Sequence, residues 1–479
     1  MKVLTEFIFV LWWAGIVWAQ NPQVPAPPIA ITGVTVIDAS GAPAQPNQTV
    51  IVRGNRIAEV GPQLKVKVPS DAVIIDGRGK FLIPGLWDMH THVAGISADP
   101  AWGDKLLPVY LAHGVTGIRD MAGNLEKLLE WKEEQARGEL VGPRMVVSGP
   151  FLDGSADGFT FKADVVVVTT PYQAQAAVQD LARRGADFIK IGSRISPEVF
   201  QAIADEAKRQ KLAFLGHLPE GVTVARASDT GMKSIEHVNG FALAVSAKEE
   251  ELRKQLRDTE AKKDWAVVVK TNAEIAASLS PEKANVLFAK LVKNQTWQVP
   301  TLVWTKTTST LDQVGAGPHL KYLPAKLQAE WAPEKIRKSS SATALAYYAV
   351  KLKSDMKLVG MMAKAGVPLL AGTDSLDPYV FPGDSIHKEL VLVVEAGLTP
   401  MQALQCATRN PAMFFGTQKE LGTVESGKLA DLLLLDADPL KDIANTQKIS
   451  GVMLNGKYYP RAELEKMLKG VEQDMAEIK

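Results

Sequence analysis

The sequence predicts an α/β fold, a (β/α)8 TIM-like barrel joined to a small β-sandwich domain that is built from both chain ends. Three observations lead to this prediction. Apolar strand-like runs alternate with helical patterns through the middle of the chain, whereas short β-rich runs between Gly, Pro and Asn turns occupy both ends. The 479 residues also exceed what one hydrophobic core usually organises. We place the sandwich at 29–82 and 418–462 and the barrel at 83–417.

The overall composition is that of a globular protein. Hydrophobic residues make up 46% of the chain and charged residues 22%, so widespread disorder is not expected. The 54 Lys and Arg residues nearly balance the 53 Asp and Glu residues, and no long basic run could neutralise a series of phosphates. We therefore expect no nucleic-acid partner, and homo-oligomerisation is left open.

Residues 1–19 carry the pattern of a secretory signal peptide. Met1-Lys2 gives a basic start, the run from Phe7 to Trp18 is apolar, and Ala19 is the small residue before the expected cut. An uncleaved membrane anchor is the alternative, but the apolar run is shorter than the roughly 20 residues that a spanning helix needs. We expect an exported protein, periplasmic or secreted, with no stable membrane span after cleavage.

The expected barrel strands follow one another along the middle of the chain. Helical patterns lie between them, for example at 171–184, 196–210 and 222–230. The strands are expected at 81–92, 116–120, 144–149, 187–192, 212–217, 234–237, 298–303 and 368–374. In a parallel barrel the carboxyl ends of the strands form the active face, so polar residues that end these strands should meet there.

The stretch between His237 and Asp374 is much longer than two strand-helix units require. It contains two insertions of helical texture, at 248–270 and 305–351. Insertions on the active face commonly shape or cover a substrate pocket. A solvated helical decoration is the alternative, and both interpretations stay open at this point.

Histidines and an aspartate end several of the expected strands. His90 and His92 form a His-x-His pair, and because side chains alternate along a strand they point the same way. His217, His237 and Asp374 each close a later run. Imidazole is a good ligand for zinc and related ions. Because four of the seven histidines lie at strand ends, the pattern predicts a metal site rather than a chance arrangement.

Lys190 is the unusual member of this set. In Phe188-Ile189-Lys190-Ile191 its amine points inward from an otherwise apolar strand. Burial lowers the pKa of a lysine, and a neutral amine can react with carbon dioxide to give an anionic carbamate. From the residues alone, a buried ion pair is the alternative.

These motifs, in this order, resemble those of the amidohydrolase superfamily, in the branch of imidazolonepropionase-like and Xaa-Pro dipeptidase-like enzymes. The resemblance extends over nearly the whole chain that follows the signal peptide. It rests on 84–92 (PGLWDMHTH), 114–120 (GVTGIRD), 189–191 (IKI), 216–217 (GH), 235–237 (IEH), 370–374 (LAGTD), 407–412 (ATRNPA) and 427–432 (GKLADL).

The resemblance implies a centre with two divalent metal ions, for which zinc is expected. His90, His92 and Asp374 would bind one ion, His217 and His237 would bind the other, and Lys190, as a carbamate, would bridge them. A hydroxide shared by the two ions would attack the substrate carbonyl. Asp374 would take the proton of this hydroxide and pass it to the leaving amine.

Two features of the sequence indicate which enzymes of this branch the chain resembles more. Lys190 favours the two-metal, dipeptidase-like side, because single-metal members such as imidazolonepropionase lack the lysine bridge. After His237 the chain runs Val238-Asn239-Gly240, without the tyrosine that anchors a carboxylate in some dipeptidases. This departure argues against a substrate with an α-carboxylate.

Other polar residues near the expected strand ends could contact substrate or could be structural. Arg119 ends the second strand and His387 follows the last one, so either could contact substrate. For Arg119 the alternative is a structural pair with Asp120 or a nearby carboxylate, whereas for His387 the pocket is favoured. His113 ends a helix and is expected to be structural, and His319 lies in loop-like sequence with no predicted partner.

We therefore predict an exported binuclear metal-dependent hydrolase that cleaves an amide or peptide-like C–N bond in a small-molecule or dipeptide-like substrate. The alternatives are an ester or lactone hydrolase on the same site, a single-metal cyclic-amidine hydrolase, and a metal-bound binding protein without catalysis. The presence of Asp374 beside a complete ligand set weighs against the last, because binding alone requires no general base.

Overall fold

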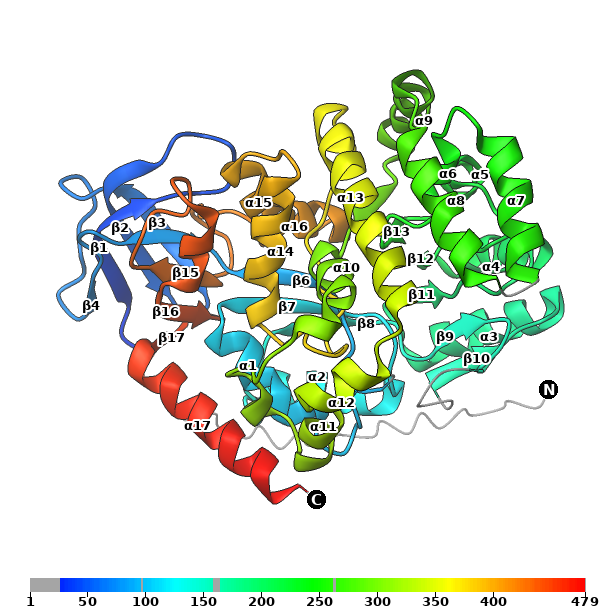
Figure 1. Cartoon of the computed structure of the whole chain (residues 1–479). Coiled ribbons are helices and arrows are strands. Elements are labelled where there is room, and N and C mark those ends of the chain that lie inside the picture. Colours follow the sequence, from blue (N-terminus) through cyan, green and yellow to red (C-terminus); the bar gives the residue numbers. More distant parts are fainter. Residues whose placement is uncertain (1–25, 96–97, 158–163, 262–263, 479) are drawn as a thin grey trace, which may run out of the picture.

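The computed structural model describes residues 26–95, 98–157, 164–261 and 264–478. The predicted signal peptide lies outside these residues. Figure 1 shows a β-rich unit at one side of the molecule, a central set of strands surrounded by helices, and a group of helices at the opposite side. The described residues contain no helix that is both long and apolar enough to cross a membrane.

The β-rich unit is a single eight-stranded sheet to which both ends of the chain contribute. Its strands are β1 (Ile29–Val36), β2 (Gln45–Arg53), β3 (Arg56–Pro62), β4 (Val73–Asp76), β5 (Phe81–Pro84), β15 (Leu432–Leu435), β16 (Ile449–Leu454) and β17 (Lys457–Pro460). The order is β17-β16-β15-β5-β1-β2-β3, with β4 beside β1. Val34, Val52, Leu82, Leu434 and Met453 share one buried cluster, so strands from the two ends of the chain build a common core.

The central strands run parallel to one another. They are β6 (Leu86–Thr91), β7 (Val115–Asp120), β8 (Arg144–Val147), β9 (Phe151–Asp153), β10 (Val165–Val167), β11 (Phe188–Ile191), β12 (Ala213–Gly216), β13 (Ser234–Glu236) and β14 (Trp297–Val299). Strands β6-β7-β8 form one sheet and β10-β9-β11-β12-β13-β14 form another. Three further contacts link these sheets: Asp187 N donates to Val147 O (2.9 Å), and parallel bridges join Gln298 to Leu369 and Thr91 to Ser375.

Helices cover these strands. They are α1 (Leu107–Ala112), α2 (Leu125–Arg137), α3 (Pro171–Arg184), α4 (Pro197–Gln210), α5 (Val224–Asp229), α6 (Phe241–Ala244), α7 (Glu249–Ala261), α8 (Trp265–Ala277), α9 (Pro281–Asn294), α10 (Leu302–Ser309), α11 (Ala325–Glu330), α12 (Pro333–Ser339), α13 (Ala342–Lys364), α14 (Asp384–Glu395), α15 (Pro400–Cys406), α16 (Arg409–Phe415) and α17 (Arg461–Glu477). Short 3-10 turns are η1 (Gly103–Leu106), η3 (Leu311–Gln313), η4 (Leu320–Tyr322) and η5 (Ile443–Gln447).

The alternation of β11 explains how the strands position the site. Ile189 and Ile191 pack into the main core with Phe200 and Ile203 of α4. Phe188 faces the other way, into a separate cluster with Leu215 and other residues from neighbouring strands. Lys190 shares the face of Phe188, because side chains two residues apart lie on the same side of a strand.

Three elements differ from the sequence prediction. The run 81–92 forms two strands, because β5 pairs with β1 and β15 in the eight-stranded sheet, and β6 begins only after Gly85. The run 368–374 forms isolated bridges rather than a regular strand. Helix α17, which extends beyond the predicted end of the β-rich unit at 462, packs Val471 and Met475 beside Val109 of α1 (Figure 1).

Candidate metal centre

The six predicted metal-binding residues lie at, or just after, the carboxyl ends of the central strands. His90 is in β6 and Lys190 in β11, and His217 and His237 directly follow β12 and β13. Asp374 follows the run that bridges to β14, and its own backbone N donates to His90 O (2.8 Å). His237 and Asp374 have positive φ angles of 62° and 65°, so the chain turns sharply at both residues.

His90, His92 and Asp374 form the first half of the site. Their ligand atoms all lie within 4.8 Å of one another. Asp374 Oδ1 is 3.1 Å from His92 Nε2 and 3.3 Å from His90 Nε2. This is a compact arrangement of two imidazole nitrogens and one carboxylate oxygen, which are ordinary donors for zinc.

His217 and His237 form the second half. Their Nε2 atoms are 3.2 Å apart, and the ring of His237 lies 4.8 Å from the ring of His90. His237 Nδ1 is 3.8 Å from Asp374 Oδ2, so Asp374 faces both halves. The structure therefore brings the four predicted histidines and the aspartate into one cluster.

Nδ1 of three histidines contacts groups outside the cluster, which directs Nε2 into it, where His92 Nε2 contacts Asp374 and His237 Nε2 contacts His217. His90 Nδ1 donates to Glu236 Oε2 (2.9 Å), His92 Nδ1 contacts Ala122 O (3.4 Å), and His237 Nδ1 donates to Thr301 Oγ1 (2.8 Å). Such acceptors fix the tautomer and the orientation of metal-binding imidazoles. All three Nε2 atoms thus face the interior of the cluster.

Lys190 has its amine enclosed beside this cluster. The residue is 2% exposed, and its Nζ has no hydrogen-bond partner among the described residues. Gly216 makes room for the side chain, since a Cβ there would lie 2.8 Å from Lys190 Cδ and 2.4 Å from Ile191 O. A buried cation without a partner is costly, and burial lowers the pKa of Lys190 to about 8 although Glu236 and Asp374 oppose the shift.

Burial keeps three of the four candidate ligand imidazoles neutral. Burial also lowers the pKa of His92, but the hydrogen bond and charge of Asp374, together with the charge of Asp120, outweigh it and raise that pKa above its ordinary value. The pKa values of His90, His217 and His237 lie well below the ordinary value, chiefly because burial disfavours the charged ring. Asp88, which accepts from Thr373 N (3.0 Å), has its pKa raised to about 7 by burial. The hydrogen bonds of Asp88 with Thr373 connect residues 368–374 to β6.

Arg119 and Glu236 form a fully buried ion pair beneath the histidines. Arg119 Nη2 donates to both oxygens of Glu236 (3.0 Å each), Nη1 donates to Ser234 Oγ (3.1 Å), and Nε donates to Met89 O (2.6 Å). Both side chains are 0% exposed. The structural alternative for Arg119 therefore describes it, with Glu236 rather than Asp120 as its partner.

His387, which the sequence places near the pocket, does not lie in the cluster. It lies on α14, where Nε2 donates to His113 O (2.9 Å) and Nδ1 accepts from Thr446 Oγ1 (2.9 Å). Both ring nitrogens are thus used inside the fold. Burial lowers the pKa of His387 to about 4, so the ring is neutral.

Two residues that support the ligands were not predicted from the sequence. Glu236 precedes His237 and should point the opposite way if strict alternation held. The positive φ of His237 ends the alternation there, so both side chains reach the same interior. Thr301, which also has a positive φ, belongs to a loop whose fold decides its contact with His237.

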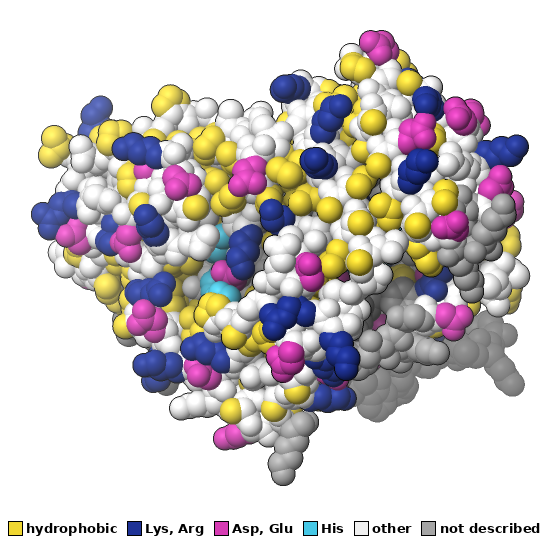
Figure 2. Space-filling model, in the orientation of Figure 1, with side chains coloured by type: hydrophobic (Ala, Val, Ile, Leu, Met, Phe, Trp, Pro, Cys, Tyr) yellow, Lys and Arg dark blue, Asp and Glu magenta, His cyan; other side chains and the backbone are white. Residues whose placement is uncertain are grey.

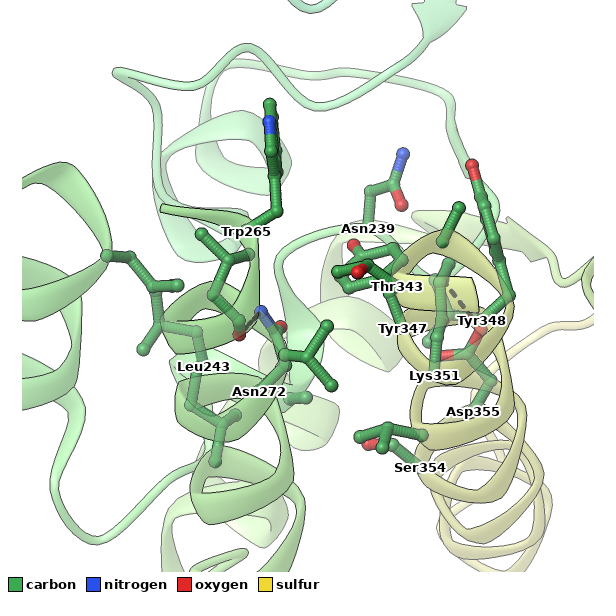
Figure 3. A pocket seen from close by; sticks show the side chains of 18 of the residues that line it. Asn239, Leu243, Trp265, Asn272, Thr343, Tyr347, Tyr348, Lys351, Ser354 and Asp355 are labelled. Carbon is green, nitrogen blue, oxygen red and sulfur yellow. Dashed lines mark hydrogen bonds and ion pairs between the residues drawn. The ribbon is translucent and has the colours of Figure 1, made fainter. Parts of the chain in front are cut away.

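The two predicted insertions line a pocket next to the cluster. The pocket has a volume of about 690 Å³, and the segment Val238-Asn239-Gly240, directly after His237, forms part of its wall. Figure 3 shows Trp265 and Asn272 of α8 facing Tyr347, Lys351 and Ser354 of α13 across it. Lys351 Nζ donates to His237 O (2.6 Å). The insertions are therefore connected to the site and are not remote decorations.

Comparisons with known proteins identify the family of this chain and proteins of similar fold. A family model described as "Amidohydrolase family" matches residues 81–458. An ochratoxinase from Aspergillus niger is 25% identical, over 88% of this chain and 85% of that protein. An imidazolonepropionase from Idiomarina loihiensis is 22% identical, over 84% of this chain and 89% of that protein. The crystal structure of a Xaa-Pro dipeptidase with bound methionine has a TM-score of 0.66 at 21% identity and covers 90% of this chain and 100% of its own.

Proposed function

The chain belongs to the amidohydrolase family, and from this premise we propose that it is a metal-dependent hydrolase that cleaves an amide C–N bond at the His90, His92 and Asp374 cluster. The observation that carries the proposal is the convergence of imidazole nitrogens and one aspartate beside a buried amine that has no hydrogen-bond partner among the described residues. An ochratoxinase covering 88% of this chain supports hydrolysis as the reaction class.

The residues fit two divalent ions, for which zinc suits the donors. His90, His92 and Asp374 would hold one ion, and His217 and His237 would hold the other. Lys190 Nζ would condense with carbon dioxide, releasing one proton, and the resulting carbamate would join the two halves. The orphaned position of this amine and its lowered pKa support that role.

Two ions bound there would lower the pKa of a water molecule and polarise the substrate carbonyl. The protein supplies the proton transfers. Asp374 Oδ1 faces His90 and His92, which leaves Oδ2 to receive a proton from the water and to return it to the leaving nitrogen. Glu236 orients His90 through Nδ1, and Arg119 holds both oxygens of Glu236 in place beneath it.

We propose that the pocket beside His237 receives an apolar part of the substrate. Leu243, Val268, Tyr347 and Tyr348 offer apolar surface, and Lys351 is already paired with Asp355. A volume of about 690 Å³ is typical of small-molecule sites. The arrangement supports an amide with an aromatic or aliphatic group rather than a highly charged molecule.

We also propose a closed barrel, a composite domain built from both chain ends, and export of the protein. The bridges of the run 368–374 to β14 and β6 support a closed (β/α)8 barrel over 83–417. The shared sheet of both chain ends supports a composite β-rich domain at 29–82 and 418–462, built as one sheet rather than as the expected sandwich. The pattern of residues 1–19 supports export, which amino-terminal sequencing of the secreted protein would test.

Hydrolysis of a panel of N-acyl amino acids, dipeptides, esters and lactones by the zinc-loaded enzyme tests the reaction. We expect turnover of amides with an apolar acyl group and a loss of roughly 10²–10⁴-fold in kcat in Asp374→Ala, the range of general acid–base catalysis. Asp312→Ala, an exposed aspartate of η3, serves as the matched control and should behave as wild type. Full amide turnover in Asp374→Ala would refute the assigned proton transfers.

A further inference from the structure

A second cluster of metal-binding side chains lies outside the strands. It consists of His113, which ends α1, His319, which precedes η4, and Asp384, the first residue of α14. Figure 2 shows histidine side chains beside acidic and basic groups in a hollow of the surface, in the region of α1 and α14. The three residues come from parts of the chain that are far apart in sequence.

The ligand atoms of this cluster are as close as those of the candidate metal centre. One ring nitrogen or carboxylate oxygen from each residue lies within 4.8 Å of the others. His319 Nε2 is 3.3 Å from Asp384 Oδ1, and the rings of His113 and His319 are 5.6 Å apart. The corresponding rings of His90 and His92 are 5.3 Å apart.

His113 is held in a ligand-ready state. Its Nδ1 donates to Val109 O (2.8 Å), which leaves Nε2 without a proton and free to bind an ion. Its carbonyl accepts from His387 Nε2, so α14 also fixes its backbone. Burial lowers the pKa of His113, which keeps the ring neutral near neutral pH.

The approach of α14 to His113 depends on Gly383. This residue has a φ of 72°, and a Cβ would lie 2.8 Å from His113 Cβ and 2.9 Å from Val109 O. Any larger residue would push the first turn of α14 away from α1. The close packing therefore places Asp384 beside both histidines.

Charge compensation by Lys388 is the alternative explanation of the cluster. Lys388 Nζ contacts Asp384 Oδ2, one turn along α14, and its side chain is 49% exposed. Exposed lysine pairs contribute little to stability, and this pair leaves Asp384 Oδ1 directed at His319. Burial raises the pKa of Asp384, but the contacts with His319 and Lys388 outweigh burial and hold it well below its ordinary value.

We propose that His113, His319 and Asp384 bind a divalent ion of the zinc class, with water completing the coordination. Two imidazole nitrogens and one carboxylate oxygen suit zinc and its first-row neighbours. The inference goes beyond the proposed hydrolysis and does not depend on it.

The ion would have a structural role. His319 belongs to the second insertion, and Tyr322 and Leu323, which follow it, pack in a common cluster with Val109 of α1 and Met475 of α17. An ion that joins His319 to α1 and α14 would fasten the insertion to the strands and helices below. Loss of the ion would loosen this region without altering His90 or His92.

The test is the number of zinc ions bound by chelator-treated full-length protein when it is titrated with zinc chloride in a calorimeter. His319→Ala and Asp384→Asn should each bind one ion fewer than wild type. Each should also lose the increase in Tm that zinc binding at this cluster produces. Lys321→Ala, two residues from His319 on an exposed ion pair, is the matched control and should bind as many ions as wild type.

Lys388→Gln separates a metal site from a charge cluster. Removal of the competing ammonium should leave the ion count unchanged and strengthen zinc binding at this cluster. Equal ion counts in wild type, His319→Ala and Asp384→Asn would overturn the proposal. An unchanged zinc affinity at this cluster in Lys388→Gln would also overturn it. Because the readout is a difference of one ion, an inactive or metal-free catalytic cluster leaves the result interpretable.

Discussion

The described residues include two clusters of two histidines and one aspartate, and these clusters are built in different ways. In the inner cluster, His90, His92 and Asp374 lie in or just after central strands and are supported by buried charges. In the outer cluster, His113, His319 and Asp384 lie on helix ends and a loop, where Lys388 is partly exposed. The donor atoms are alike, so the surroundings distinguish the two.

The surroundings suggest different roles. The inner cluster has two further histidines beside it, His217 and His237, a buried amine in Lys190, and a pocket of about 690 Å³ next to it. A reactive site needs such extra groups to position water, substrate and protons. The outer cluster joins elements that are distant in sequence, an arrangement typical of structural metal sites.

Glu236→Gln should have the largest effect on stability. The change leaves Arg119 buried without a negatively charged partner, which typically costs about 3–5 kcal/mol in free energy of unfolding. Glu420→Gln is the matched control, because its pair with Arg56 is 47% exposed on both sides and should contribute about 1 kcal/mol or less. Urea unfolding measures both variants. Equal losses would mean that the inner cluster does not depend on the buried pair.

Glu389→Gln should change how stability varies with pH. Glu389 lies on α14, the helix that begins at Asp384 of the outer cluster, and accepts from Val303 N (2.7 Å). Burial raises its pKa from 4.5 to about 8, so the folded protein keeps a proton that the unfolded chain releases.

Wild type should therefore lose stability as the pH rises from 4.5 to about 8, whereas the glutamine variant, which stays neutral, should lack this contribution. We expect the difference in free energy of unfolding between the two proteins to grow by a few kcal/mol across this interval. Urea unfolding at several pH values measures it. Parallel curves for the two proteins would contradict the assignment.

Gly383→Ala should have a smaller effect, confined to the outer cluster. The added Cβ would lie 2.8 Å from His113 Cβ at a residue whose φ is 72°. Backbone strain and overpacking should together lower the free energy of unfolding by about 1–3 kcal/mol. Gly416→Ala is the matched control, since its φ is 73° but nothing lies within 4 Å of its Cβ. Thermal unfolding measures the stability of both variants. The stability that Gly383→Ala loses beyond the loss in Gly416→Ala is the cost of placing the Cβ against His113. Equal losses would show that α14 can move away from α1 freely.

Much of the fold could be predicted from local patterns. The helix 171–184 was predicted with the bounds that α3 has, since Pro171 and the following Gly185 mark its ends. The split between β5 and β6 at Gly85 was missed, because a continuous apolar run shows no change of sheet. The absence of a regular last strand at 368–374 reflects tertiary contacts that no local pattern records.

The inner cluster was predicted because strand ends of a parallel fold converge by rule. His90, His92, His217, His237 and Asp374 are together for that reason. The role of Glu236 was missed because it depends on the left-handed turn at His237. The outer cluster was not foreseen either, since the path of the insertion that carries His319 decides its contacts.

The most direct test of the central claim is the zinc content of Lys190→Ala beside that of wild type, with bicarbonate present during loading and amide hydrolysis measured on the same samples. The account predicts that the variant binds at least one ion fewer and loses amide turnover, because the carbamate that joins the two halves cannot form. Equal zinc content and equal turnover in the two proteins would contradict a two-ion centre bridged through Lys190.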